Sequence, residues 1–149
     1  MTDYNEEEPH YLLDSNIVSE IIKHEPDFNV LKQIAAHNSD CAICAPSWQE
    51  LLFGLYRLPD GMNKKYLETF IKDDVHETFK IKNYTEKAAD IHADLRSKLE
   101  KLGCPTQKDD SQIAAIALAN HMVLVTRNTK HFTAIQEVCD LQVENWFEE

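Results

Sequence analysis

Three carboxylates stand where apolar runs give way to helical patterns. Asp14 follows the run at 11–13, and Glu50 lies one helical turn after the run at 41–45. Asp110 opens an alanine-rich segment. Carboxylates held close together repel one another unless a divalent cation neutralises them, and ligation by oxygen alone selects Mg²⁺ or Mn²⁺. If the fold brings these residues together, they predict a metal site suited to phosphodiester hydrolysis by activated water.

Each acid also has a local alternative. Ser47 and Glu50 have the spacing of a capping box, in which the glutamate only bonds the backbone at its own helix start. Asp109 and Gln112 fit a similar arrangement, which leaves Asp110 free to face the sheet. The joint pattern favours the metal site, because three caps that coincide at one sheet edge would not all need to point inward.

A polar loop follows the apolar run at 122–126. It carries Arg127, Asn128, Lys130 and His131, and it fits either an ordinary surface loop or a set of contacts to a phosphate. His131 is interpreted as a loop histidine or a phosphate contact rather than a metal ligand. Arg127, Lys130 and His131 are therefore the predicted phosphate contacts, and Asn128 is a candidate supporting residue.

The elements that must position these side chains alternate along the chain. Strands are predicted at 11–13, 41–45, 78–81, 122–126 and 141–143. Helices are predicted at 15–23, from 27, from 46 to before 59, and at 63–72, 84–102, 109–120 and 129–134. This alternation indicates an α/β domain with a parallel sheet covered on both faces, whose strand ends gather ligands at one edge.

The length and net charge of the chain limit the classes of protein to which it could belong. The chain has 149 residues and a net charge of −11, which fits one domain at 10–149 after an acidic and flexible leader at 1–9. An extended basic surface for nucleic acid is excluded, although a small basic rim is not. No apolar run is long enough for a membrane span and no secretory signal opens the chain, so a cytoplasmic protein is expected.

The four cysteines are interpreted as thiols of the core rather than metal ligands. Cys41 and Cys44 form a C-x-x-C, but within a strand residues three apart point to opposite faces and cannot readily share one metal. Cys104 and Cys139 do not supply a second closely spaced pair.

At these residues the chain resembles the PIN-domain ribonucleases of the VapC toxin type. The resemblance is carried by LLDSNIVSE at 12–20, SWQELLFG at 47–54, DSQIAAIALA at 110–119 and LVTRNTKHF at 124–132. It implies a three-layer α/β/α domain with a central, mainly parallel sheet of about five strands. It also implies the toxin half of a type II toxin–antitoxin pair, an endoribonuclease that cuts RNA with Mg²⁺ or Mn²⁺.

The resemblance also assigns roles to individual residues. Asp14, Glu50 and Asp110 fall on the family's acidic positions, and Asn128 stands where the family's T-x-D pattern has its fourth acid, as in many relatives. One firmly held ion is therefore expected. Ser47 and Asn16 match polar residues that line the family's site.

The same resemblance implies partners. Structured RNA, either tRNA or ribosomal RNA, is the expected substrate, and a homodimer is the expected assembly. A small antitoxin of the VapB kind is expected to occupy the active-site groove with an arginine at the acidic pocket, which suits a protein of net charge −11.

Two other readings stay open at this point. A degenerate PIN fold could act only as a binding or autoregulatory partner, and Asn128 is the support for that reading. A phospho-receiver module is disfavoured because it needs an acceptor aspartate at the end of its third strand, where this chain has Lys80-Ile81-Lys82.

Overall fold

A five-stranded parallel sheet forms the centre of the computed structural model, which describes residues 8–147. The strand order is β3-β2-β1-β4-β5. The strands are β1 (Tyr11–Leu13), β2 (Cys41–Cys44), β3 (Lys80–Lys82), β4 (Val123–Val125) and β5 (Val143–Glu144). The fold class predicted from the sequence is confirmed, whereas the predicted leader at 1–9 lies almost wholly outside the described residues.

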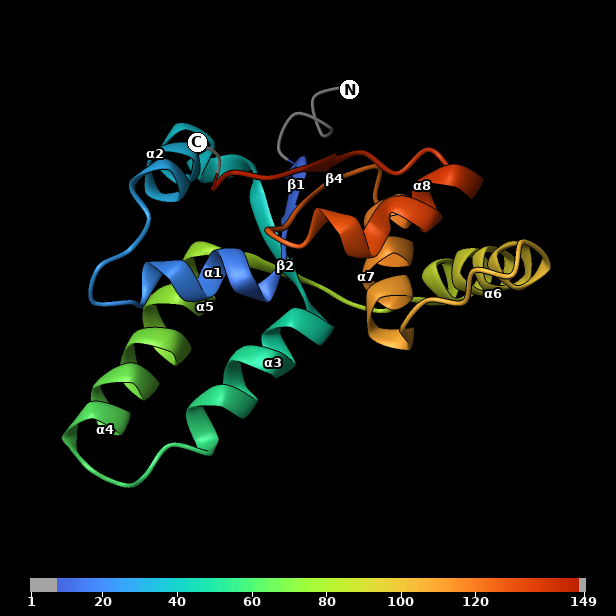
Figure 1. Ribbon diagram of the computed structural model, residues 1–149. Helices are drawn as coiled ribbons and strands as arrows, with labels where there is room; N and C mark the ends of the chain where they lie inside the picture. Colours follow the sequence, from blue (N-terminus) through green and yellow to red (C-terminus); the bar gives the residue numbers. More distant parts are fainter. Residues whose placement is uncertain (1–7, 148–149) are drawn as a thin grey trace.

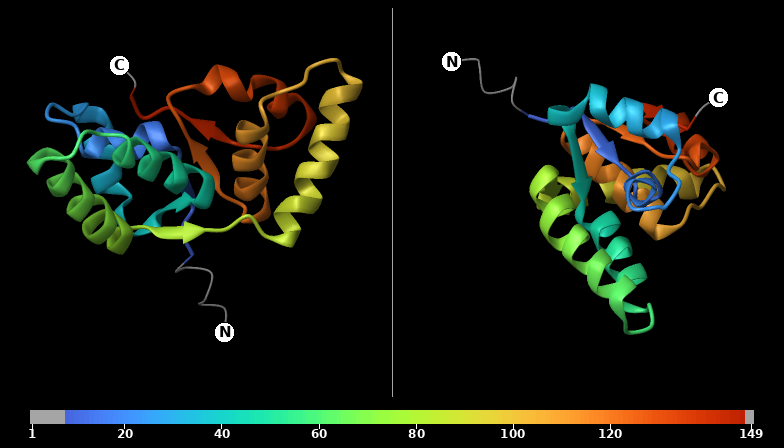
Figure 2. Two further views of the ribbon diagram at one scale, coloured as in Figure 1. Left: turned by 90° about the horizontal axis from the view of Figure 1, so that it is seen from below. Right: turned by 90° about the vertical axis from the view of Figure 1, so that its left-hand side faces the viewer.

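Helices cover both faces of the sheet (Figures 1 and 2). On one face lie α6 (Glu86–Lys101), α7 (Lys108–Ala119) and α8 (Thr133–Val138). The other face carries α1 (Ser15–Ile21), α2 (Phe28–Ala36), α3 (Ala45–Tyr56), α4 (Met62–Thr69), the π-helical segment η3 (Phe70–Val75) and α5 (His76–Thr78). The short 3₁₀ segments are η2 (Asn38–Asp40) and η4 (Thr129–Phe132).

Side chains that alternate along the strands pack into two separate hydrophobic cores, one on each face of the sheet. Leu12 and Leu124 belong to the core under α6 and α7, while Leu13 and Val125 belong to the core under α1 and α3. All four side chains are fully buried, as expected for a parallel sheet with helices on both faces. In the parallel register Leu13 pairs with both Ile43 and Val125, so β1, β2 and β4 end at the same edge.

The order of the strands places a crevice at this edge. After β1 the chain builds β2 and β3 on one side, then returns to build β4 and β5 on the other. Adjacent connections that run in opposite directions leave a crevice between β1 and β4, and open α/β sheets bind ligands at such a point.

Several boundaries differ from the prediction. The helix predicted at 63–72 continues through η3 to Thr78, because Ile71 and Val75 both find buried positions along it. The third strand therefore starts at Lys80 rather than at 78. The last strand is Val143–Glu144 rather than 141–143, since Leu141 is buried in the core beside α8 instead of paired in the sheet.

Two observations in the described part of the chain concern classes of protein that were considered from the sequence. The third strand ends at Lys82 with no acid at its carboxyl end, which agrees with the argument against a phospho-receiver. No helix within residues 8–147 is both long and apolar enough to cross a membrane.

The cysteines divide into two classes. Cys41 and Cys44 are buried in the two different cores, which confirms that they face opposite sides of the sheet. Cys104 is exposed, so its prediction as a core thiol was wrong: it follows the turn at Gly103, where φ is 72° and the chain leaves α6 along the surface. Cys139 is half-buried.

We expect Cys104 to react rapidly with Ellman's reagent in the folded protein, while Cys41 and Cys44 react only after unfolding. Burial, with a smaller effect of Asp40, raises the pKa of Cys41 to about 12, and burial also raises the pKa of Cys44. Only the thiolate reacts. Cys104→Ser should remove the fast phase and Cys139→Ser should keep it; fast labelling of Cys41 or Cys44 in guanidinium-free buffer would contradict the assignment.

Candidate active site

Asp14 lies at the carboxyl end of the central strand β1, with its side chain only 8% exposed. Its backbone N–H donates to Val125 at 2.9 Å, which ties it to β4. The carboxylate oxygen Oδ1 accepts from the backbone N–H of Ser15 at 2.8 Å and from the Ser47 hydroxyl at 3.4 Å. Asp14 is therefore the N-cap of α1, and the positive end of that helix stabilises its charge.

The other carboxylate oxygen of Asp14 is held from β4. The Thr126 hydroxyl, fully buried, donates to Oδ2 at 2.8 Å, and the Asn16 amide lies 3.5 Å from the same oxygen. Thr126 Oγ1 in turn accepts from the backbone N–H of Asn128 at 3.1 Å. Asn16 Oδ1 accepts from the backbone N–H of Arg127 at 3.1 Å. The network closes the crevice between β1 and β4 around one carboxylate.

Thr126 was absent from the residues predicted for the site. It stands at the first position of the T-x-N sequence whose third position, Asn128, was predicted. A buried threonine at a strand end is ordinarily read as part of the strand, and only the contact to Asp14, 112 positions away, shows its role. Ser47 and Asn16 were predicted as lining residues, and both contact Asp14.

Asp110 projects from the first turn of α7 toward the same edge, and 20% of its side chain is exposed. Burial raises the pKa of Asp110; His131, whose Nδ1 lies 3.5 Å from Oδ2, opposes this, and the charges of Asp14 and Asp109 add to it. The helix begins at Lys108 without a side-chain cap, so the cap suggested for Asp109 is not formed. Asp109 is exposed and lines a neighbouring pocket.

Glu50 is exposed on α3. The capping box suggested for Ser47 and Glu50 is not formed, because α3 begins earlier, at Ala45, and the Ser47 hydroxyl turns to Asp14 instead. Within residues 8–147 no three His, Cys, Asp or Glu side chains are grouped as a metal would require. The structure thus brings Asp14 and Asp110 within electrostatic reach of each other.

The donor set fits a hard divalent cation at Asp14 and Asp110. Both ligands are carboxylates, which Mg²⁺ and Mn²⁺ prefer. Burial is the main cause of the raised pKa of Asp110, and the repulsion from Asp14 that adds to it is an interaction that a cation would relieve. Convergence of Asp14, Glu50 and Asp110 on one ion therefore stays a prediction.

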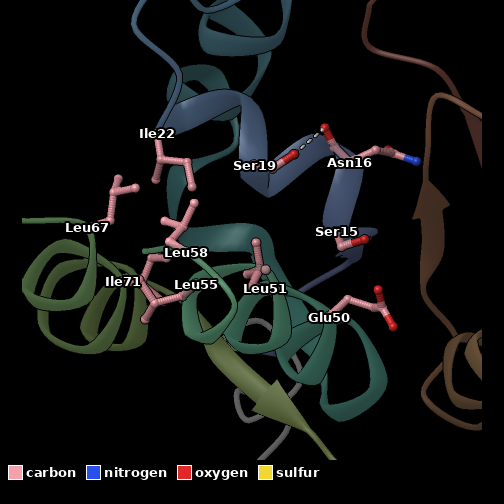
Figure 3. Close-up of a pocket in the computed structure, with 11 residues that line it drawn as sticks. Ser15, Asn16, Ser19, Ile22, Glu50, Leu51, Leu55, Leu58, Leu67 and Ile71 are labelled. Carbon is pink, nitrogen blue, oxygen red and sulfur yellow. Dashed lines mark hydrogen bonds between the residues drawn. The ribbon is translucent and has the colours of Figure 1, made fainter. Parts of the chain in front are cut away.

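A groove of about 380 Å³ runs from this edge between α1, α3 and α4. Figure 3 shows that its two ends differ in chemistry: Ser15, Asn16 and Glu50 lie at one end and leucine and isoleucine side chains gather at the other. The apolar end is lined by residues from four segments of the chain, namely Ile22, Leu51, Leu55, Leu58, Leu67 and Ile71. A ligand with one polar and one apolar part would match it.

The predicted phosphate contacts surround the edge without forming a single cluster. Arg127 is exposed, and its guanidinium lies 4.4 Å from the centre of the Phe147 ring. His131 faces Asp110, and Lys130 is exposed on η4. The three residues give the acidic edge a small basic rim in a protein of net charge −11.

The chain is similar to known proteins in both sequence and structure. The family model "PIN domain" matches residues 11–138. Ribonuclease VapC2 of Rickettsia felis is 31% identical over 91% of this chain and 97% of its own length. VapC ribonuclease Y4jK of Sinorhizobium fredii is 31% identical over 83% of this chain and 90% of its own. The crystal structure of FitAcB from Neisseria gonorrhoeae aligns with a TM-score of 0.84 at 27% identity, covering 93% of this chain and 99% of that one.

We expect Thr126→Val to destabilise the fold by about 1–3 kcal/mol, because it keeps the side chain's shape while it removes the 2.8 Å donor to Asp14 Oδ2 and the acceptor of the Asn128 N–H. Thr126→Ser is the control: it keeps the hydroxyl and loses one methyl group, at a cost of about 1 kcal/mol or less. Urea denaturation measures both variants. A smaller loss in Thr126→Val than in Thr126→Ser would show that the hydroxyl is not what holds Asp14.

We expect Asp110→Asn to raise the Tm at pH 8, on the order of 2 °C. Because the pKa of Asp110 is raised on folding, the folded state binds more protons between the ordinary and the raised pKa, and the free energy of unfolding falls as pH rises through that window. The gain in Asp110→Asn should therefore shrink as the pH falls toward 4, and it should vanish only well below the ordinary aspartate pKa of 3.8, where Asp110 is protonated in both states.

The control for this pH dependence is Asp90→Asn, which removes an exposed carboxylate from α6. It should leave the Tm almost unchanged at every pH. Thermal scans from pH 4 to pH 8 compare the three proteins, and a lower Tm for Asp110→Asn at pH 8 would refute the argument.

Proposed function

The chain belongs to the PIN-domain family, and from that premise we propose that it is a metal-dependent endoribonuclease and the toxin of a type II toxin–antitoxin pair. The observation that carries the proposal is the buried Asp14 carboxylate, held by four donors at the β1–β4 crevice beside Asp110. The names of its relatives, two of them ribonucleases, support the same activity.

We propose that Asp14 and Asp110 hold the cation, Mg²⁺ or Mn²⁺. When bound, such an ion supplies positive charge to the scissile phosphate and lowers the pKa of a coordinated water. The protein's part is to fix the Asp14 carboxylate in place. Its four donors satisfy the charged form, and the N-terminus of α1 stabilises it.

Glu50 takes a different role in this proposal. Its exposed carboxylate lies at the polar end of the groove rather than in the Asp14 network. From that end it can accept a proton from the attacking water, or complete the ion's ligands when substrate is bound. Arg127, Lys130 and His131 would contact the phosphates on either side of the cut.

Asn128 supports the site through its backbone. Its N–H donates to Thr126, the residue that anchors Asp14. The amide side chain adds no charge, which agrees with a site built around one firmly held ion. The reading of Asn128 as a sign of a degenerate binding module is not favoured, because the anchored aspartate and its donors are complete.

The groove suits the antitoxin. We propose that a VapB-like partner lays a short segment across it, with apolar side chains at the leucine-lined end and an arginine at Glu50 and Asp14. Net charge of −11 favours a basic partner.

We also propose a substrate, an assembly, a location and a domain extent for the protein. Structured RNA, tRNA or ribosomal RNA, is the proposed substrate, and the protein is proposed to act as a cytoplasmic homodimer. Residues 10–149 are proposed to form one PIN-like domain.

We expect the purified protein to cleave RNA with Mg²⁺ or Mn²⁺ and to stop with EDTA. Asp14→Asn should lose at least about a hundredfold in rate, since charge stabilisation by the ion depends on it. Its expression should no longer arrest cell growth. Asp90→Asn, which removes an exposed carboxylate from α6, is the matched control and should keep nearly full activity. Cleavage that continues in EDTA and leaves 2′,3′-cyclic phosphate ends would sink the metal mechanism.

A further inference from the structure

A second pocket lies on the other side of Glu50 from the groove. It measures about 250 Å³, and its walls include Gln49 and Glu50 from α3, Tyr84 before α6, and Asp109 and Gln112 from α7. Glu50 lines both hollows and forms the ridge between them. Pockets for drug-sized ligands span roughly 300–1,000 Å³, so this pocket suits one small planar group.

The lining combines an aromatic side chain with hydrogen-bonding amides. Tyr84 is 38% exposed, and an exposed aromatic ring gives a nucleobase a surface on which to stack. The amides of Gln49 and Gln112 can donate to and accept from the edge of a base. The carboxylates of Glu50 and Asp109 only accept. This excess of acceptors favours bases with an exocyclic amino group over uracil.

Tyr84 is held in place by a buried chain of hydrogen bonds. Its hydroxyl lies 2.8 Å from Nδ1 of His92, and the two rings meet edge to face at 5.9 Å. His92 Nε2 lies 2.7 Å from the Ser111 hydroxyl, which donates to the carbonyl of Lys108 at 3.0 Å. Burial, and then Arg96 and Lys108, lower the pKa of His92. A neutral imidazole accepts from Tyr84 and donates to Ser111, which satisfies every group in the chain.

This chain links the aromatic wall to the catalytic edge. Ser111 directly follows Asp110 in the first turn of α7. The position of the Tyr84 ring is thus fixed relative to the carboxylate proposed to hold the ion. A base stacked on Tyr84 would place its own phosphate at a set distance from Asp110, and such positioning contributes strongly to rate.

We propose that this pocket is a nucleobase subsite, which binds the base beside the scissile phosphate and prefers adenine, cytosine or guanine to uracil. The proposal rests on the proposed nuclease function and adds a determinant of its sequence preference. Tyr84 is the stacking surface, Gln49 and Gln112 read the base, and His92 is a positioning residue.

Nucleotide titrations followed by NMR test the subsite without any need for cleavage. Titration of the labelled full chain with AMP or CMP, in EDTA, should shift the side-chain amides of Gln49 and Gln112, and UMP should bind more weakly. Tyr84→Leu should weaken AMP binding at least about tenfold, whereas Tyr84→Phe, which keeps the ring, should stay within about threefold. Tyr66→Leu removes an exposed tyrosine from α4 and should match wild type.

Two results of the titration would overturn the subsite. One is a set of shifts that spares Gln49 and Gln112, and the other is equal AMP affinity in Tyr84→Leu and wild type. Because no cleavage is required, the titration decides the subsite even for a protein that cuts no RNA.

Cleavage of a pool of RNAs with randomised bases then separates the subsite from the nuclease function. Wild type should avoid uracil at one position beside the cut, and Gln112→Leu and Tyr84→Leu should lose that preference with a KM raised at least about tenfold. Cleavage with the same preference and KM in all three proteins would overturn the subsite alone. Absence of cleavage by wild type, with Mg²⁺ or Mn²⁺ present, would overturn the nuclease function instead.

Discussion

The burial of one negative charge, on Asp14, is the constraint on which the rest of this structure depends. A carboxylate that is 8% exposed is costly unless hydrogen bonds replace its lost water. The donors here come from three separate parts of the chain: the start of α1, the serine in the first turn of α3 and the end of β4. Those segments meet at one point only when β1 lies between β2 and β4. The strand order and the anchored charge therefore support each other.

The surroundings of Asp110 differ from those of Asp14, because the burial of Asp110 is poorly compensated. Asp14 is surrounded by donors, whereas Asp110 is partly desolvated beside like charges, with His131 as its opposing partner. The fold thus holds one carboxylate that is well satisfied and one that is not. Ligands that bring positive charge, whether an ion or a basic peptide, gain affinity from the unsatisfied one. Active sites commonly retain such groups at a cost in stability.

Local sequence patterns were sufficient for most of the fold and part of the site. Apolar runs located β1, β2 and β4 because strands buried on both faces leave an uninterrupted signal. Asp14 and Asp110 were found because an acid at a strand end or helix start stands out. The start of α1 at Ser15 was predicted correctly, whereas α3, α6 and α7 begin one or two residues from their predicted starts.

The contacts that sequence could not supply all span long separations. Thr126 reaches Asp14 across 112 positions, and no local pattern records that contact. Tyr84, His92 and Ser111 come together only because α6 packs against α7. Glu50 was placed correctly on its helix, but its position relative to Asp14 depends on how α3 crosses the edge. Helix crossing is a property of tertiary packing rather than of periodicity.

The π-helical segment η3 lets one continuous helix line the groove along its first part and pack into the hydrophobic core along its last part. A π turn holds more residues than an α turn, so it offsets the helical faces that precede and follow it. Before and within it, Leu67 and Ile71 line the groove, while Val75 further along enters the core beside α1 and α2. A chain shorter by one residue between 70 and 75 could continue as a regular α-helix. The side chains that line the groove and those that enter the core would then no longer point in their present directions. The length of this segment is thus part of the groove's design, and relatives that differ in it by a single residue would present a differently shaped wall to their partners.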